Sequence, residues 1–287
     1  DPKTYNMSVD ALSEKLIQAE KLGKLPKVVI PVHFAGQPCD MPSFHALSKR
    51  YGFKIIEDAS HAIGASYKKV KVGSCTYSDI TVFSFHPVKI ITTAEGGMAL
   101  TNDKNIADKI FRLRTHGITN DKMKMKQQSE DEIWNYQQID LGFNYRMNDI
   151  QAALGLNQMK RLDKFVKQRH KIAEFYYTNL KKLPLTLPWQ SPSAYSSYHL
   201  FPVLIKFSLG TKTQKLVYNE LRKNDIAVNL HYIPVHRHPY YENLGFKKND
   251  FPKAEKFYQE VISIPMYATL QDVHQEYVVE ILKKVMK

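Results

Sequence analysis

Short apolar runs and amphipathic stretches alternate along the first two-thirds of the chain. Four short runs predict buried strands, at Val28–Val32, Phe53–Glu57, Ile80–Phe85 and Met98–Thr101. Between and after them, the spacing of apolar residues predicts helices over Ser43–Tyr51 and Asn102–Arg114. Strands that alternate with helices indicate an α/β fold with a mostly parallel sheet covered on both faces.

A longer stretch of helical periodicity, from Asp149 to about Leu180, predicts one helix that links two domains. The segment Leu183–Ser197, rich in Pro and Ser, suits a connector. After it we expect strands and helices in alternation, namely strands Tyr198–Lys206, Ala227–Tyr232 and Val261–Ile264, and helices Thr211–Asn224, Phe251–Glu260 and Gln271–Val285. We therefore predict part of a large domain over 1–182, ending in the long helix, and a small C-terminal α+β domain over 183–287. The polar segment Asp121–Trp134 predicts a mobile loop.

Composition narrows the class of protein. The 287 residues are 43% hydrophobic and 24% charged, as in soluble globular proteins, and no apolar run is long enough to cross a bilayer. Residues 1–25 contain no signal-peptide core. The two cysteines, Cys39 and Cys75, lie far apart without a metal-ligand pattern. We expect free thiols, no metal site, no membrane partner and a cytoplasmic protein.

The net charge of +13 allows two interpretations. A basic surface can bind nucleic acid, or its field can attract an anionic small molecule such as a nucleotide diphosphate. The lysines are scattered, and no helix-turn-helix, zinc-finger or RNA-binding signature accompanies them. We therefore predict no nucleic-acid partner and a solvated basic surface.

Two segments carry candidate chemistry. In Ile55–Ala65, Asp58 falls at the carboxyl end of a predicted strand, the edge where ligands bind in open α/β sheets. In Phe83–Gly97, the chain leaves a strand, turns at Pro87, presents Lys89 and ends in two glycines that permit a tight backbone path.

These residues suit pyridoxal phosphate, which needs a lysine for its aldehyde, a carboxylate for its ring nitrogen and donors for its phosphate. Lys89 and Asp58 could reach one ligand, Ser84 offers a hydroxyl, and His61 could bond the phenolic oxygen of the ring. Taken singly, the residues also fit blander roles: a solvated lysine, and an aspartate in a turn or cap. For His86 we expect a packed core position.

Six runs together resemble the DegT/DnrJ/StrS family of sugar aminotransferases, which have fold type I and depend on pyridoxal phosphate. The runs occur in family order and span essentially the whole chain: PVHFAGQPCDM (31–41), EDASHAIGA (57–65), SFHPVKIITTAEGG (84–97), LRTHGI (113–118), LGFNYRMNDIQAALGLNQMKRLD (141–163) and HYIPVHRHPYY (231–241). Several independent motifs in order make the resemblance specific.

The resemblance implies roles for particular residues. Lys89 would be the Schiff-base lysine and proton carrier, and Asp58 would pair with the ring nitrogen. His61 would lie near the ring oxygen, and Ser84 would bind the phosphate. Asn144 would reach the phosphate of the neighbouring subunit's cofactor, which implies a homodimer with composite active sites.

Three further residues, Arg146, Tyr232 and His236, match family positions near the sugar nucleotide. An ion-paired arginine and packed loop aromatics are the alternatives for them. Members that dehydrate sugars carry histidine in place of the Schiff-base lysine, so Lys89 implies transamination.

The runs YQQIDLGFNYRMNDIQAALG (136–155) and NLHYIPVHRHPYY (229–241) are similar to the branch of the family that acts in pseudaminic acid biosynthesis. This implies that L-glutamate donates an amino group to the C4 ketone of a UDP-linked 4-keto-6-deoxy-N-acetyl-hexosamine and becomes 2-oxoglutarate. A D-configured 4-keto sugar and a non-catalytic relative are the alternatives.

The chain departs from the family pattern in two places. Ala94 stands where the family usually has Gly. Family members also carry a substantial stretch before the point that matches Asp1, which supplies a helix N-terminus for the phosphate and an aromatic that stacks on the ring. We expect the sequence to be a fragment of a longer protein that is poorly soluble or inactive alone.

Overall fold

A four-stranded sheet organises the first half of the computed structural model, which describes residues 1–126, 132–206 and 213–286. Its strands are β1 (Val28–Val29), β2 (Lys54–Asp58), β5 (Ile80–Ser84) and β6 (Gly97–Leu100), in the order β1-β2-β5-β6. β1 and β5 both run parallel to β2, whereas β6 is antiparallel to β5. The predicted α/β fold with a mostly parallel sheet is confirmed, and the two parallel pairings bring the carboxyl ends of β1, β2 and β5 to one edge.

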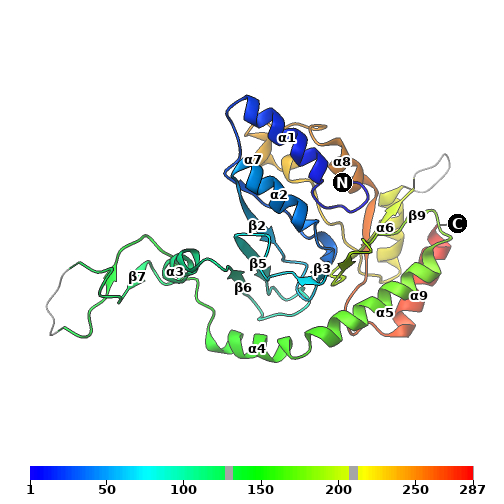
Figure 1. The fold of residues 1–287 in the computed structure, drawn as a ribbon. Helices are drawn as coiled ribbons and strands as arrows, with labels where there is room; N and C mark the ends of the chain where they lie inside the picture. The colour runs from blue at the N-terminus through cyan, green and yellow to red at the C-terminus, as the bar shows by residue number, and fades with distance from the viewer. Residues whose placement is uncertain (127–131, 207–212, 287) are drawn as a thin grey trace.

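Two helices, α1 (Val9–Lys21) and α2 (Met41–Tyr51), lie side by side over β2 (Figure 1). Leu16, Phe44 and Ile55 belong to the buried apolar cluster between them and the sheet. α1 is a helix that we did not predict, because its apolar face is a narrow stripe at Val9, Leu12 and Leu16 within a charged stretch. α2 confirms the helix predicted over Ser43–Tyr51 and begins two residues earlier.

The single helix predicted over Asp149–Leu180 is two helices, α4 (Asp149–Met159) and α5 (Leu162–Leu180). The helical path breaks at Arg161, where φ is −106° and ψ is −3°. None of the α4 residues is buried, whereas α5 buries six. The periodicity of apolar residues does not predict this break, because apolar residues continue through it. The break separates the exposed helix α4 from the buried helix α5.

α5 contacts two separate apolar clusters. Near its start, Leu162 and Phe165 pack against the cluster of Phe83, Phe85 and neighbouring alanines behind the large sheet. Its second half contributes Ile172, Ala173, Tyr176 and Leu180 to the C-terminal core. α5 therefore bridges the two cores, as the predicted linking helix requires, while the boundary at residue 182 stays a prediction.

The C-terminal core surrounds a three-stranded sheet, β12-β11-β9, and α5 lies along α9 beside it (Figure 1). Along the chain from residue 185, the elements are β9 (Leu185–Thr186), β11 (Phe201–Ile205), α6 (Gln214–Lys223), α7 (Pro239–Glu242), α8 (Pro252–Glu260), β12 (Val261–Ile264) and α9 (Asp272–Val285); α7 buries no residue and is drawn beside α2 in Figure 1. The strand predicted over Ala227–Tyr232 is wrong: only Asn229 forms an isolated bridge, to Ser263. The predicted connector Leu183–Ser197 holds β9 and also β10 (Ala194–Tyr195).

β10 joins the two halves by pairing with β3 (Ser66–Tyr67), which pairs with β4 (Val70–Lys71). Arg169 of α5 joins them again at the interior. Its Nη1 donates to the carbonyl oxygens of Tyr198 at 3.0 Å, His199 at 3.1 Å and Met266 at 2.8 Å. The approach to β11 is thus fixed to α5 by a buried guanidinium.

Between β6 and α4 the chain runs out into an arm, which holds α3 (Lys104–Leu113), β7 (Ile118–Thr119) and β8 (Gln137–Gln138) (Figure 1). Of the predicted loop Asp121–Trp134, residues 127–131 lie outside the described residues. The arm and α4 expose large apolar side chains: Leu141 is 87% exposed and Ile150 is 84% exposed. Within the described residues, no helix has the length and apolarity to span a membrane.

Candidate active site

Asp58 and Lys89 lie at the same edge of the large sheet. Asp58 is the last residue of β2, and Lys89 follows the neighbouring parallel strand β5 by five residues. The backbone amide of Ser60 donates to Asp58 Oδ1 at 3.0 Å, which orients the carboxylate. The carboxylate is near enough to the Lys89 amine to raise its pKa, although burial is the larger influence and lowers that pKa overall. The lysine and the carboxylate predicted from the sequence therefore share one site.

A tight turn presents Lys89. The Lys89 amide donates to the His86 carbonyl at 2.9 Å. The Phe85 amide donates to the Gly96 carbonyl at 2.9 Å, and the Phe85 carbonyl accepts from the Thr93 amide at 3.0 Å. Gly96 has φ of 156°, and a Cβ there would clash with the Thr93 hydroxyl. This clash explains why the turn after Lys89 has glycine at position 96. Ala94, where the family usually has glycine, has a left-handed φ of 65°, which costs an alanine about 1–2 kcal/mol.

His61 forms one wall of the site and is held neutral. The Ala35 amide donates to its Nδ1 at 3.3 Å, so the ring proton resides on Nε2, which lies 3.4 Å from Tyr232 Oη. Burial lowers the pKa of His61 to about 3, and the nearby Lys89 amine adds to the effect. A neutral His61 can donate one hydrogen bond from Nε2 without adding positive charge to the site.

Two further histidines, His199 and His231, border the site and were not predicted. The ring of His199 lies 4.4 Å from that of His61, and burial holds its pKa well below the usual value. Burial also lowers the pKa of His231, with Lys89 contributing. His231 begins the run HYIPVHRHPYY (231–241), which resembles the family. His199 precedes β11 in a stretch without a motif, so only the tertiary structure shows that it lies at the site.

Tyr232, which we predict to lie near the sugar nucleotide, is next to His61. Its hydroxyl reaches His61, and both burial and the charge of Asp58 raise its pKa, so the phenol stays protonated. His236 is elsewhere: it is buried, with Nε2 2.8 Å from Glu255 Oε1 and its ring against Phe251. A role for His236 near the sugar stays a prediction.

Ser84 ends β5, five residues before Lys89, and its hydroxyl lies 3.5 Å from the His86 amide. Its role in binding a phosphate stays a prediction. The expectation that His86 is a packed core residue is wrong, since half of its side chain is exposed and its Nε2 lies 3.8 Å from Glu95 Oε1 at the surface. The turn that presents Lys89 also turns His86 outward.

Asn144 and Arg146 lie outside the Lys89 cluster. Asn144 forms an isolated bridge with Thr115 at the base of the arm, and both Asn144 and Arg146 are exposed. The structure therefore does not bring these two predicted residues to Asp58 or Lys89 of the same chain. The role of Asn144 in a neighbouring subunit's site and the role of Arg146 near the sugar nucleotide both stay predictions.

The described residues fit pyridoxal phosphate. A half-buried amine and an oriented carboxylate lie within electrostatic reach of each other, and a planar neutral imidazole lies beside both. The amine can bind the aldehyde, the carboxylate can pair with the ring nitrogen, and the Ser84 hydroxyl can reach the phosphate. The lysine and the aspartate at this sheet edge therefore match the groups that a pyridoxal-phosphate site needs.

The comparisons with known proteins identify the family. The model of the DegT/DnrJ/EryC1/StrS aminotransferase family matches residues 1–283. The UDP-4-amino-4,6-dideoxy-N-acetyl-beta-L-altrosamine transaminase of Campylobacter jejuni is 34% identical over 284 residues, which are 96% of this chain and 72% of that protein. The chain therefore belongs to this family of pyridoxal-phosphate-dependent sugar aminotransferases.

Solved structures of sugar aminotransferases have the same fold as this chain. Helicobacter pylori PseC, described as an aminotransferase involved in the biosynthesis of pseudoaminic acid, superposes with a TM-score of 0.84 at 31% identity, over 98% of this chain and 71% of PseC. The putative sugar aminotransferase Spr1654 of Streptococcus pneumoniae, in its PMP form, gives 0.86 at 30% identity, over 100% of this chain and 74% of that one.

Proposed function

We propose that the protein transfers an amino group from L-glutamate to the C4 ketone of a UDP-linked 4-keto-6-deoxy-N-acetyl-hexosamine, as a step of pseudaminic acid biosynthesis. The observation that carries the proposal is the meeting of Lys89, Asp58 and His61 at one sheet edge. The names of the C. jejuni transaminase and of H. pylori PseC support the choice of sugar.

Lys89 is the proton carrier in this proposal. Its lowered pKa favours a neutral amine, which is the form that removes a proton. Lys89 takes the proton from Cα of L-glutamate, and in the second half-reaction it delivers a proton to C4 of the sugar. The amino group passes from donor to acceptor. L-glutamate is oxidised by two electrons to 2-oxoglutarate, and those two electrons reduce the ketone of the sugar to an amine.

The other residues hold the reactants. Bound pyridoxal phosphate supplies an aldehyde that accepts the amino group and a ring that withdraws electrons. Asp58 keeps the ring nitrogen protonated, Ser84 binds the phosphate, and His61 donates from Nε2 to the phenolic oxygen. Tyr232 borders the space beside His61 and is proposed to contact the sugar, as are Arg146 and His236.

The substrate class is tested by supplying a panel of 4-keto-6-deoxy sugars with L-glutamate and measuring amino-sugar formation by mass spectrometry. The panel holds L-altro and D-configured UDP sugars and one GDP sugar. We expect kcat/KM for the L-altro UDP sugar to exceed that for the others by at least about 10-fold. Preference for a D-configured sugar would contradict the proposed pathway but leave sugar transamination intact.

A homodimer with shared active sites is the second part of the proposal. The exposed apolar side chains of the arm and α4 form a surface that a monomer would leave in water. Because Asn144 lies on this surface and Lys89 lies in the body, we propose that Asn144 binds the phosphate in the partner's site.

Complementation tests this arrangement. The variants Lys89→Ala and Asn144→Ala are each expected to lose activity, and their co-expression should restore part of it. In the mixed dimer, one site carries both substitutions and the other carries neither. Mixed dimers that are as inactive as the parents would place Asn144 in its own subunit's site and contradict the proposal.

A further inference from the structure

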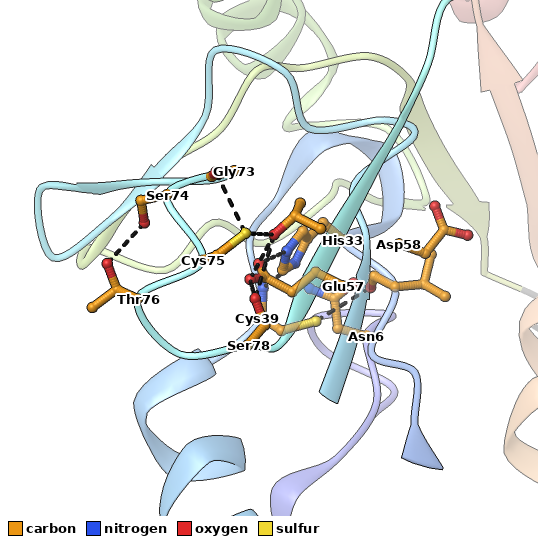
Figure 2. Close-up of polar contacts among 12 residues, drawn as sticks. Asn6, His33, Cys39, Glu57, Asp58, Gly73, Ser74, Cys75, Thr76 and Ser78 are labelled. Atoms are coloured by element: carbon orange, nitrogen blue, oxygen red, sulfur yellow. Dashed lines mark hydrogen bonds and ion pairs between the residues drawn. The ribbon is translucent and has the colours of Figure 1, made fainter. Parts of the chain in front are cut away.

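Behind Asp58, on the other face of β2, a charged group is buried that takes no part in the proposed reaction. Glu57 is 4% exposed, and its partner His33 is 0% exposed. Glu57 Oε2 lies 2.7 Å from His33 Nε2. Successive side chains of a strand point to opposite faces, and Figure 2 shows Asp58 directed away from the Glu57 cluster.

The hydrogen bonds determine which nitrogen of a neutral His33 ring carries the proton. The Cys39 amide donates to His33 Nδ1 at 3.0 Å, so the proton of a neutral ring must reside on Nε2 and is donated to Glu57. The other Glu57 oxygen accepts from the hydroxyls of Ser78 and Thr81. Burial by itself would raise the pKa of Glu57, but the hydrogen bonds from His33, Ser78 and Thr81 oppose burial, and the pKa is lowered overall. Glu57 is therefore a buried, fully hydrogen-bonded carboxylate.

The pair is joined to Asp58 through the backbone. The His33 amide donates to the Asp58 carbonyl at 3.0 Å, and the Asp58 amide donates to the Pro31 carbonyl at 3.0 Å. One residue, His33, thus bonds Glu57 with its ring and Asp58 with its backbone. The ring contact with Glu57 and the backbone bond to Asp58 are therefore made by the same residue, next to the strand end that carries Asp58.

We propose that Glu57 and His33 are positioning residues for Asp58, and that the buried charge of Glu57 helps keep the cofactor ring nitrogen protonated. The inference rests on the proposed pairing of Asp58 with that nitrogen. A second carboxylate one residue away adds negative potential where the positive ring develops, and the surrounding protein screens it less than water would. The strand end is held by the same contacts, so charge and geometry act together.

The substitution Glu57→Gln isolates the charge. Its amide oxygen can accept from His33 Nε2, and its amide nitrogen can donate to the Ser78 and Thr81 hydroxyls, so the shape and the hydrogen bonds are kept. Thr81→Val is the matched control, because it removes one hydroxyl from the cluster and leaves the carboxylate. The readout is the nitrogen-15 chemical shift of the ring nitrogen in bound, labelled pyridoxal phosphate, followed from neutral pH to pH 10.

In Glu57→Gln we expect the ring nitrogen to lose its proton at a pH about 1 unit lower than in the wild type, while Thr81→Val follows the wild type. Asp58→Asn should show an unprotonated ring throughout. An unchanged signal in Asp58→Asn would overturn the proposed role of Asp58 itself. A shifted signal in Asp58→Asn with wild-type behaviour in Glu57→Gln would overturn only the inference about Glu57 and His33.

If Glu57→Gln fails to bind pyridoxal phosphate, amide hydrogen exchange of the cofactor-free protein replaces the chemical shift. Faster exchange of the His33 and Asp58 amides than in Thr81→Val would support the positioning role. Equal protection of both amides in the two variants would overturn it.

Discussion

Replacing Lys89 with alanine is expected to abolish transamination, with kcat/KM falling by at least about 10³-fold. The variant loses both the amine that binds the cofactor aldehyde and the base that moves protons at the donor Cα and the sugar C4. It should also lose the visible absorption that pyridoxal phosphate acquires when it is linked to a lysine. Absorption spectra and amino-sugar formation measure the two effects separately.

Lys15→Ala is the matched control for this prediction, since Lys15 is exposed on α1 and alanine favours a helix. It should keep both the absorption and the activity. Retention of the absorption in Lys89→Ala would mean that another lysine holds the cofactor, and the assignment of the site would be wrong.

Replacing Asp58 with asparagine should lower kcat by about 10²–10³-fold. The amide has almost the same shape and can still accept from Ser60, but it cannot pair with a protonated ring nitrogen, so the ring withdraws electrons poorly. Binding of pyridoxal phosphate through Lys89 should persist, which separates this effect from loss of the cofactor. The comparison is of kcat with absorbance in the same preparation.

Asp163→Asn, a change of the same kind at an exposed position of α5, is expected to leave kcat unchanged. If Asp58→Asn also kept wild-type kcat, the ring nitrogen would need another partner. His61 is too weak a base for that role, since burial lowers its pKa to about 3.

The placement of Asp58 and Lys89 at one sheet edge could be predicted because it depends on local pattern, whereas the roles proposed for them come from the resemblance to the family. Apolar runs end at Asp58 and shortly before Lys89, and parallel strands put both at one edge. What a side chain meets across the sheet is not encoded so locally. Glu57 reads as the polar end of a strand, yet it is buried against His33, which lies 24 residues earlier in the chain.

The predictions that the structure contradicts, at Asp149–Leu180, Ala227–Tyr232 and His86, failed for a related reason. The helix over Asp149–Leu180 keeps its apolar spacing through Arg161, so the break follows from how α5 packs on two cores. The residues over Ala227–Tyr232 have strand-like composition, but only Asn229 finds a partner strand. The sequence around His86 suggests a core position, but the turn after β5 leaves half of its side chain exposed. In each case tertiary contacts override local preference.

If Lys89 and Asp58 form a working aminotransferase site, the visible spectrum of the protein with bound pyridoxal phosphate should change when L-glutamate is added. We expect the absorption of the lysine-linked cofactor to disappear with glutamate and to return when the 4-keto sugar is added, with 2-oxoglutarate and the amino sugar formed in equal amounts. Cofactor that binds to Lys89 but keeps an unchanged spectrum with glutamate would show that the two residues do not form such a site.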